Sequence, residues 1–243
     1  MIKGIYTSAV GMQSRILEED ITANNLANVN TTGFKKDAVH FKKVLDGSLV
    51  ILGQNGGEQG LADSQQVRIN FAQGELKPTG NSLNAALDGR GFFVVLTEDG
   101  EAYTRNGNFM LDSEGGLVTS EGFKVLGRSG PIELFPGAVE IRESGEIYQN
   151  NTLVDEFRLV DFSDSAMLEK QGAGLFVSTE NRPDTMEAEG TIVRQGYLEE
   201  SNVNAISEMV RLIMISKAFQ AGQKAIQAQD RTLDRAVNSV GRY

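Results

Sequence analysis

The chain has no cysteine, no tryptophan and a single histidine, His40. The absence of cysteine excludes disulfide bonds, thiolate catalysis and cysteine-ligated metal sites. His40 has no second histidine and no carboxylate at ligand spacing, so it predicts neither a metal site nor a catalytic centre. We therefore expect no metal and no cofactor.

Long apolar runs are also missing from the 243 residues. No stretch approaches the roughly 20 apolar residues of a membrane-spanning helix, so we predict no membrane span. Residues 1–4 do not open an apolar run that ends in a small-residue cleavage site, and we expect no removable signal peptide. The length allows one large domain or two moderate ones.

The negative charge is concentrated in the middle of the chain. The formal net charge is −10, and residues 1–33 sum to −1 while residues 199–243 sum to +1. The stretch between them therefore carries the whole excess, with 25 acidic and 15 basic side chains. An acidic middle argues against nucleic acid or anionic lipid as a partner. Nearly neutral ends suit segments that pack against like copies.

The C-terminal forty residues show the clearest helical pattern. A heptad count from Leu212 returns to Phe219, Ile226 and Leu233, whereas the position three residues earlier runs from Met209 through Ser216, Gln223 and Asp230. Polar residues on one seam of a long helix select a particular register or partner. At about 1.5 Å per residue the helix is roughly 55 Å long, more than a compact domain of this size needs. We interpret it as an assembly element; the alternative is a long core helix of an ordinary enzyme.

A second helical pattern occupies residues 2–28. Ile5, Met12, Ile16 and Leu26 recur at helical spacing, and an asparagine-rich run follows at residues 24–30. Asparagine and glycine tolerate left-handed backbone conformations and end helices, so we expect the helix to stop there. We predict that the two terminal helices pair as a coiled coil.

Residues 67–198 favour β structure. Short apolar runs alternate with turn signals at the spacing of an antiparallel meander or sandwich of ten or so strands. We expect hairpin turns at residues 98–100, at Asn106-Gly107 and at residues 143–145. The glycine-rich stretch 53–60 indicates an exposed loop.

The predicted fold class is α+β: long N- and C-terminal helices that pair as a coiled coil, with an inserted, mainly antiparallel β domain. Residues 1–33 together with 200–243 form the assembly domain in this interpretation. Residues 34–75 form a connecting segment with a flexible loop, and residues 76–199 form an outward-facing β domain.

Enzymatic interpretations have little support in the residues. Gly89 and Gly91 lack the third glycine and the βαβ pattern of a dinucleotide loop. Carboxylate pairs such as Glu199-Glu200 are typical of solvated charge rather than of glycoside hydrolysis. A secreted β-rich hydrolase is the main rival class, and a soluble adaptor or chaperone is a third. We predict no enzyme and no catalytic residue.

Three motifs resemble a known family. Asn-Asn-Leu-Ala-Asn-Val-Asn-Thr-Thr-Gly-Phe-Lys at residues 24–35 is similar to the N-terminal signature of bacterial flagellar rod and hook proteins. Residues 87–93 and 103–109 resemble the middle domain of the longer members. Residues 196–204 resemble the entry into the C-terminal helix. The motifs occur in the expected order and span nearly the whole chain.

The resemblance implies a structural subunit of the flagellar rod, the drive shaft of the basal body. Such subunits are exported unfolded by the flagellar export machinery without a cleaved signal. They polymerise helically with themselves and with neighbouring rod subunits to transmit torque across the periplasm. The length is that of the two longer rod members, and residues 127–132, residues 159–162 and the short 53–66 loop look more like the proximal one. A distal-rod or hook-type subunit is the alternative. The predicted assembly interface comprises Ile5, Met12, Ile16, Asn25, Leu26, Asn28, Met209, Leu212, Phe219, Ile226 and Leu233.

Overall fold

The computed structural model describes residues 2–41, 65–163, 167–179, 185–188 and 190–240. The predicted loop at residues 53–60 lies outside the described part. The backbone of His40 belongs to a described strand, but its side chain lies outside the described part. The chain divides into two compact units. Unit 1 comprises Met1–Ala27, Asp37–Arg68 and Asn204–Tyr243, and unit 2 comprises Asn28–Lys36 and Ile69–Val203.

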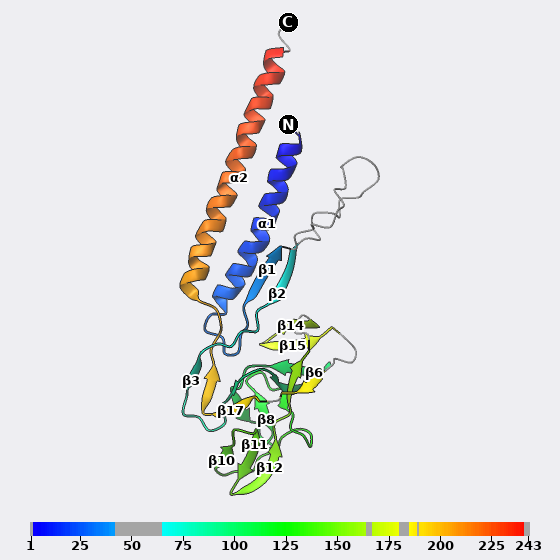
Figure 1. Cartoon of the computed structure of the whole chain (residues 1–243), viewed down its shortest axis with the longest axis vertical. Coiled ribbons are helices and arrows are strands. Elements are labelled where there is room, and N and C mark those ends of the chain that lie inside the picture. The colour runs from blue at the N-terminus through cyan, green and yellow to red at the C-terminus, as the bar shows by residue number, and fades with distance from the viewer. Residues whose placement is uncertain (1, 42–64, 164–166, 180–184, 189, 241–243) are drawn as a thin grey trace. The chain divides into compact units, whose positions relative to one another are not determined.

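Unit 1 is mainly helical. Helix α1 (Ile2–Ala27) and helix α2 (Ala205–Val240) lie side by side, next to a pair of strands, β1 (Asp37–Phe41) and β2 (Gln65–Ile69) (Figure 1). The side chain of Asn204 caps α2, because its Oδ1 accepts a hydrogen bond of 2.9 Å from the backbone N–H of Ser207. An ion pair of 3.8 Å between Arg211 and Glu18 joins the two helices.

The prediction of two long helices that pair as a coiled coil is wrong. Helix α1 has 26 residues and α2 has 36, so the N-terminal helix is too short to accompany α2 along its length. Ile16 and Met209, two residues of the predicted seam, are 48% and 51% exposed. A coiled coil needs two apolar rows on each helix, and the second row of α2 is polar at Ser216, Gln223 and Asp230. The described residues instead form two helices of unequal length and a β-rich unit.

Unit 2 is built around a nine-stranded sheet in which all described pairs are antiparallel. The strands run in the order β14-β15-β6-β5-β9-β8-β7, while β13 pairs with β5 and β16 pairs with β13. These nine strands are β5 (Phe92–Thr97), β6 (Gly100–Thr104), β7 (Phe109–Leu111), β8 (Leu117–Thr119), β9 (Lys124–Val125), β13 (Leu159–Phe162), β14 (Leu168–Gly172), β15 (Leu175–Ser178) and β16 (Thr185–Glu187).

Three smaller sheets complete unit 2. One has three strands in the order β10-β11-β12, and the other two pair β17 with β4 and β18 with β3. Their strands are β3 (Leu76–Pro78), β4 (Ala85–Asp88), β10 (Val139–Ile141), β11 (Glu146–Gln149), β12 (Thr152–Glu156), β17 (Ile192–Gln195) and β18 (Tyr197–Glu199).

Two of the three expected hairpins are confirmed. Strands β5 and β6 pair across residues 98–100, and β10 and β11 pair across residues 143–145. The turn expected at Asn106-Gly107 is wrong, since β6 and β7 are not paired. Gly107 instead lies against β4, where a Cβ atom would be 1.5 Å from the carbonyl oxygen of Ala85. The glycine is required by this close approach rather than by a turn.

Strand β5 lies between the two hydrophobic clusters of unit 2. Phe93 belongs to one cluster, where its ring lies 5.1 Å from that of Phe109 and 5.2 Å from that of Phe157. Phe92 belongs to the other cluster, with its ring 5.6 Å from that of Phe176. Because both faces of β5 are covered, its sequence is a continuous apolar run without alternation.

We expect Phe93→Ala to lower the free energy of unfolding of unit 2 by about 3–5 kcal/mol, because it leaves a cavity between two packed rings. Urea denaturation followed by circular dichroism measures the change. Leu153→Ala is the matched control: Leu153 is 51% exposed, and its truncation should change stability by less than about 0.5 kcal/mol. Equal effects of the two substitutions would contradict this assignment of the core.

Candidate functional site

Three charged side chains from distant parts of the sequence meet inside unit 2. Lys35 follows the asparagine-rich run, Arg105 follows β6, and Glu199 ends β18. The Nζ of Lys35 lies 2.5 Å from Oε1 of Glu199, and Nη1 of Arg105 lies 3.3 Å from Oε2 of the same carboxylate. All three side chains are at most 5% exposed. We refer to Lys35, Arg105 and Glu199 as the ionic node.

Backbone groups complete the hydrogen bonding of the ionic node. Lys35 Nζ donates to the carbonyl of Ala72 at 2.9 Å, and Arg105 Nη2 donates to the carbonyl of Gly89 at 2.8 Å. The N–H of Gly74 donates to Oε1 of Glu199 at 2.8 Å. A buried charge is tolerated only when it is paired and hydrogen-bonded, so each member of the ionic node depends on the others.

The electrostatics of the ionic node are those of a structural site. Burial lowers the pKa of Lys35, and the carboxylate of Glu199 acts in the opposite direction. Burial also lowers the pKa of Arg105, again against the effect of Glu199. Both oxygens of Glu199 are engaged by cations, which leaves this carboxylate unsuited to act as a general base.

Asn202 extends the network to the backbone beside the node. Its Oδ1 accepts a hydrogen bond of 2.8 Å from the N–H of Lys36, and its Nδ2 donates to the carbonyls of Asn70 and Ala72, each at 2.8 Å. The chain passes between the two units after residues 27, 36, 68 and 203. The stretches 28–36, 69–74 and 199–203, which adjoin these passages within unit 2, are therefore bound to one another.

Gly33 allows the backbone of the motif at residues 24–35 to lie close to the backbone of the motif at residues 103–109. Its φ is +68°, and a Cβ atom there would lie 2.5 Å from the backbone nitrogen of Asn106. Its N–H donates to the carbonyl of Glu199 at 2.8 Å. The sequence places Gly33 only in the motif at residues 24–35 and predicts no contact for it. The contact with Asn106 and Glu199 could not be found from local pattern, because its partners are distant in sequence.

The predicted interface residues of α1 differ from one another in burial and in the element that they contact. Met12 is half-buried and faces Gly222 of α2, where a Cβ atom would be 3.0 Å from Met12 Cγ. Asn25 is buried and joins α1 to β1: its Nδ2 donates to the carbonyl of Asp37 at 2.8 Å, and its Oδ1 accepts from the N–H of Asp37 at 2.9 Å. The side chain of Ile5 lies outside the described part.

The remaining predicted interface residues are half-buried, apart from the exposed Ile16 and Met209. The carbonyl of Asn28, which belongs to unit 2, accepts a hydrogen bond of 3.1 Å from the N–H of Thr31. The half-buried residues are Leu26, Asn28, Leu212, Phe219, Ile226 and Leu233. Their role in assembly stays a prediction, since the structure contains one subunit.

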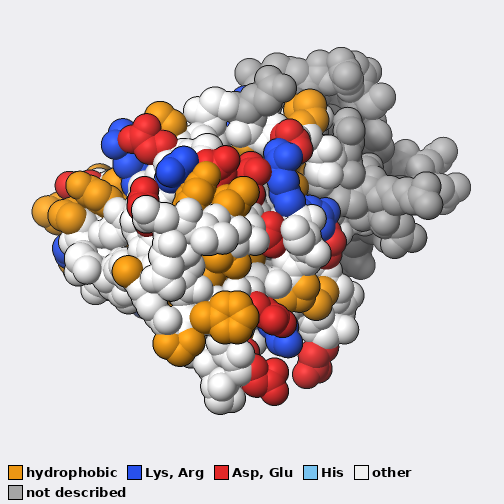
Figure 2. Space-filling view, turned by 90° about the horizontal axis from the view of Figure 1, so that it is seen from below, with side chains coloured by type: hydrophobic (Ala, Val, Ile, Leu, Met, Phe, Trp, Pro, Cys, Tyr) orange, Lys and Arg blue, Asp and Glu red, His pale blue; other side chains and the backbone are white. Residues whose placement is uncertain are grey.

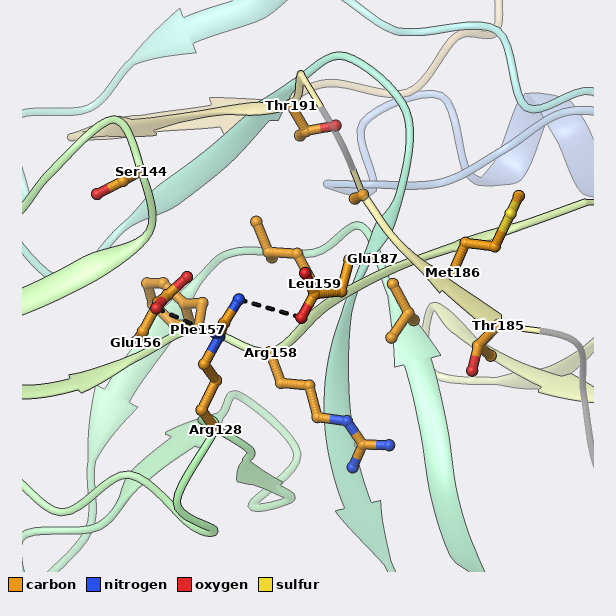
Figure 3. A pocket seen from close by; sticks show the side chains of 12 residues that line it. Arg128, Ser144, Glu156, Phe157, Arg158, Leu159, Thr185, Met186, Glu187 and Thr191 are labelled. Carbon is orange, nitrogen blue, oxygen red and sulfur yellow. Dashed lines mark hydrogen bonds and ion pairs between the residues drawn. The ribbon is translucent and has the colours of Figure 1, made fainter.

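A pocket of about 490 Å³ in unit 2 is lined by four charged side chains among apolar and hydroxyl-bearing ones. Arg128 lies between two acidic side chains, 3.2 Å from Glu156 and 3.1 Å from Glu187 (Figure 3). Arg158, which also lines the pocket, forms an ion pair of 2.7 Å with Glu101. The described residues contain no cluster of three metal-ligating side chains. Neither α1 nor α2, as far as the structure describes them, is long and apolar enough to cross a membrane.

Comparison with protein families matches three models along the chain. The "Flagella basal body rod protein" model matches residues 5–35, the "Flagellar hook protein FlgE/F/G D1 domain" model matches residues 86–149, and the "Flagellar basal body rod FlgEFG protein C-terminal" model matches residues 194–239. Each match contains one member of the ionic node.

Whole-chain relatives agree with these matches. The chain is 32% identical to "Flagellar basal-body rod protein FlgG" of Bacillus subtilis, over 98% of this chain and 99% of the relative. It is 35% identical to the FlgG protein of Borreliella burgdorferi, over 98% of each. It is 34% identical to "Flagellar basal-body rod protein FlgF" of Caulobacter vibrioides, over 100% of this chain and 99% of the relative.

The two-unit fold and these matches together define a structural protein of the bacterial flagellum. The chain belongs to the flagellar basal-body rod protein family. As a member it is a structural subunit of the rod and not an enzyme, which excludes the hydrolase. The printed names of these relatives give no position within the rod, so the choice between proximal and distal rod stays a prediction.

We expect Glu199→Gln to lower the free energy of unfolding by about 3–5 kcal/mol, because two buried cations lose their counter-charge. Glu200→Gln is the neighbouring control. Glu200 forms a solvent-exposed pair with Lys77 at 3.0 Å, and its loss should cost at most about 1 kcal/mol. Urea denaturation of both variants measures the difference. Similar losses would show that the ionic node contributes no more than a surface ion pair.

We also expect a fragment of residues 28–203 to unfold cooperatively, because it retains the whole ionic node and both core clusters. A fragment of residues 37–198 lacks Lys35 and Glu199 and should melt at a lower temperature or without a cooperative transition. Calorimetry of the two fragments tests this. Equal melting temperatures would mean that unit 2 does not need its two flanking stretches.

Proposed function

We propose that this subunit polymerises into the rod through the exposed faces of its helical unit. One observation carries the proposal. Ile206, Met209, Val210, Ile213 and Met214 recur at helical spacing along the first turns of α2, and all are 44% to 75% exposed. A continuous apolar row of this kind on a helix is typical of a surface that a partner covers.

The energetics favour burial of this row by a neighbour. Complete burial of a side chain such as isoleucine or methionine contributes about 1.5–3 kcal/mol relative to full exposure. Cover of five such residues therefore contributes several kcal/mol toward association, which partly offsets the loss of translational and rotational freedom. The partners in this proposal are other copies of the chain and neighbouring rod subunits.

The predicted interface residues lie on the other side of α2, because at about 3.6 residues per turn they fall on the face opposite the exposed row. Leu212, Phe219, Ile226 and Leu233 are half-buried in the single subunit, so a neighbour can cover what remains. A contact between different surfaces of successive subunits does not close on itself, and its product is an open helical tube. Such a tube transmits torque because each subunit is held by its neighbours.

The proposal also assigns a separate role to each segment of the chain. Residues 1–33 with 200–243 serve assembly, residues 34–75 connect, and residues 76–199 face outwards. The contacts of Gly33 and Lys35 with Glu199 favour drawing the folding boundary of the β-rich unit at residues 28 and 203 instead.

Export and placement follow from the same reasoning. We propose that the flagellar export machinery passes the chain unfolded and without a cleaved signal, and that the rod it enters spans the periplasm. The absence of cysteine supports this route, because no disulfide can form before or during transit. The sequence of residues 127–132 and 159–162 supports a position in the proximal rod, with distal-rod and hook-type positions as the alternatives.

Substitution of the exposed row tests the assembly surface. We expect Ile213→Asp or Met214→Asp to abolish polymerisation, because a carboxylate would have to be buried at the contact. Electron microscopy and sedimentation of the concentrated protein, alone and mixed with other rod subunits, measure the effect. The exposed Gln223→Asp, which lies on the same helix but outside the row, is the control and should assemble normally.

Thermal unfolding separates the effect on assembly from one on folding. Ile213 and Met214 are exposed in the subunit, so both variants should melt within about 2 °C of the unmodified protein. Normal filaments from Ile213→Asp would rule out this face of α2.

A further inference from the structure

Methionine is the side chain of this protein that peroxides oxidise most readily. The full sequence has no cysteine and no tryptophan, but it has seven methionines. Peroxides convert the thioether of an accessible methionine into a sulfoxide, and no thiol of this chain competes for the oxidant. The positions of the methionines therefore decide what an oxidant does to the molecule.

Two of the methionines belong to the exposed apolar row of α2. Met209 is 51% exposed and Met214 is 65% exposed. At about 3.6 residues per turn, they lie on opposite sides of the line that runs from Ile206 through Val210 to Ile213. A neighbour that covers the row therefore comes close to both sulfur atoms.

Met209 has only apolar neighbours on the surface of the helix. Residues three or four positions apart are the neighbours of a helical side chain. For Met209 these residues are Ala205, Ile206, Leu212 and Ile213. None of these four side chains carries a hydrogen-bond donor, so a polar group at position 209 finds no partner among them.

Met214 differs from Met209 in this respect. Its neighbours at the same spacing are Val210, Arg211, Lys217 and Ala218. The side chain of Lys217 is exposed, and its ammonium group has three donors. A polar group at position 214 therefore has a cation beside it on the same helix.

Oxidation changes the polarity of a methionine and leaves its size nearly unchanged. A lone pair on the sulfur attacks one oxygen of hydrogen peroxide, and the O–O bond breaks. The sulfur is oxidised by two electrons and keeps that oxygen as a sulfoxide, while the hydroxide that leaves takes the remaining proton and becomes water. The sulfoxide oxygen is a hydrogen-bond acceptor, and its burial without a donor is unfavourable.

Two methionines of unit 2 are as accessible as Met209 but lie outside the row. Met110 on β7 is 45% exposed, and Met186 on β16 is 50% exposed. On the face of the molecule that Figure 2 shows, apolar side chains lie in separate groups among charged ones. A sulfoxide on a mixed surface of this kind stays in contact with water, which satisfies its oxygen.

We propose that Met209 is an oxidation site that regulates assembly. Hydrogen peroxide converts Met209 to the sulfoxide in the free subunit, and the modified subunit is excluded from the polymer. In an assembled subunit a neighbour covers the row, so the same sulfur is protected. The proposal deepens the proposed function and rests on it, because the sulfoxide acts only if the row is the assembly surface.

Peroxide treatment of the full-length protein before assembly tests the site. Peptide mass spectrometry should find Met209 and Met214 oxidised to similar extents, because both are exposed. The protein concentration needed for assembly, measured by sedimentation, should rise about tenfold, since an unpaired acceptor would be buried at the contact. Reduction by methionine sulfoxide reductases and a thiol should reverse the rise.

Substitutions assign the effect to one sulfur atom. Each variant is compared with itself before and after peroxide, so that any effect of the substitution alone cancels. Met209→Leu should limit the rise to less than about twofold, because leucine has a similar apolar volume and no sulfur. Met214→Leu, and a control chain with both Met110→Leu and Met186→Leu, should keep most of the rise. A full rise in Met209→Leu, or no rise in the unmodified protein once Met209 is oxidised, overturns the proposal.

Thermal unfolding separates a block of assembly from damage to the fold. The oxidised protein should melt within about 2 °C of the untreated one, because Met209 is exposed in the subunit. Met12 is half-buried against Gly222, and its oxidation would instead disturb the helical unit. A larger fall in melting temperature that persists in Met209→Leu would assign the loss of assembly to unfolding and overturn the proposal.

The oxidation site and the proposed function can fail separately. If Ile213→Asp abolishes assembly but oxidation of Met209 does not raise the required concentration, the proposed function stands and the oxidation site fails. If assembly is indifferent to Ile213→Asp, and Met209 is oxidised equally fast in free and assembled protein, the row is not the assembly surface and the proposed function itself fails.

Discussion

A single buried carboxylate organises the β-rich unit. Glu199 accepts from Lys35 and Arg105 and from the backbone of Gly74, and its own carbonyl accepts from Gly33. Charges without solvent are held only by such complete sets of partners, so the segments that supply them cannot separate independently. The three family motifs are thus parts of one physical contact. Their residue types are those that the contact requires: a small residue for close approach, two cations and one anion.

Local patterns predicted much of the fold. The hairpins near Gly100 and Gly145 followed from turn chemistry, and the apolar run of β5 followed from burial on both faces. The end of α1 at Ala27 followed from the asparagine-rich sequence behind it. In each case the deciding residues are close in sequence, where steric and hydrogen-bonding preferences act directly.

The wrong predictions have a different cause: the residues that decide these features are distant in sequence. The heptad rows of α2 identified its half-buried side, but the coiled coil needed a second apolar row and a longer partner helix, and the chain has neither. Asn106-Gly107 resembles a hairpin turn, yet Gly107 is small because the backbone of Ala85 passes beside it. The ionic node was not predicted, since Lys35 and Glu199 are 164 positions apart and nothing local distinguishes them from surface charges. Such pairings depend on tertiary structure alone.

The distance in sequence between Lys35 and Glu199 also determines when their ion pair can form during export or synthesis of the chain. A chain that becomes available gradually from its N-terminus exposes Lys35 early, but the carboxylate that neutralises it becomes available only when about four-fifths of the polypeptide has emerged. Until then the lysine remains hydrated, because the carboxylate that would pair with it and with Arg105 after β6 is missing. Contacts between distant residues slow folding because a large loop must first be closed. The late arrival of Glu199 thus delays the packing of the segment around Lys35 until most of the chain is present.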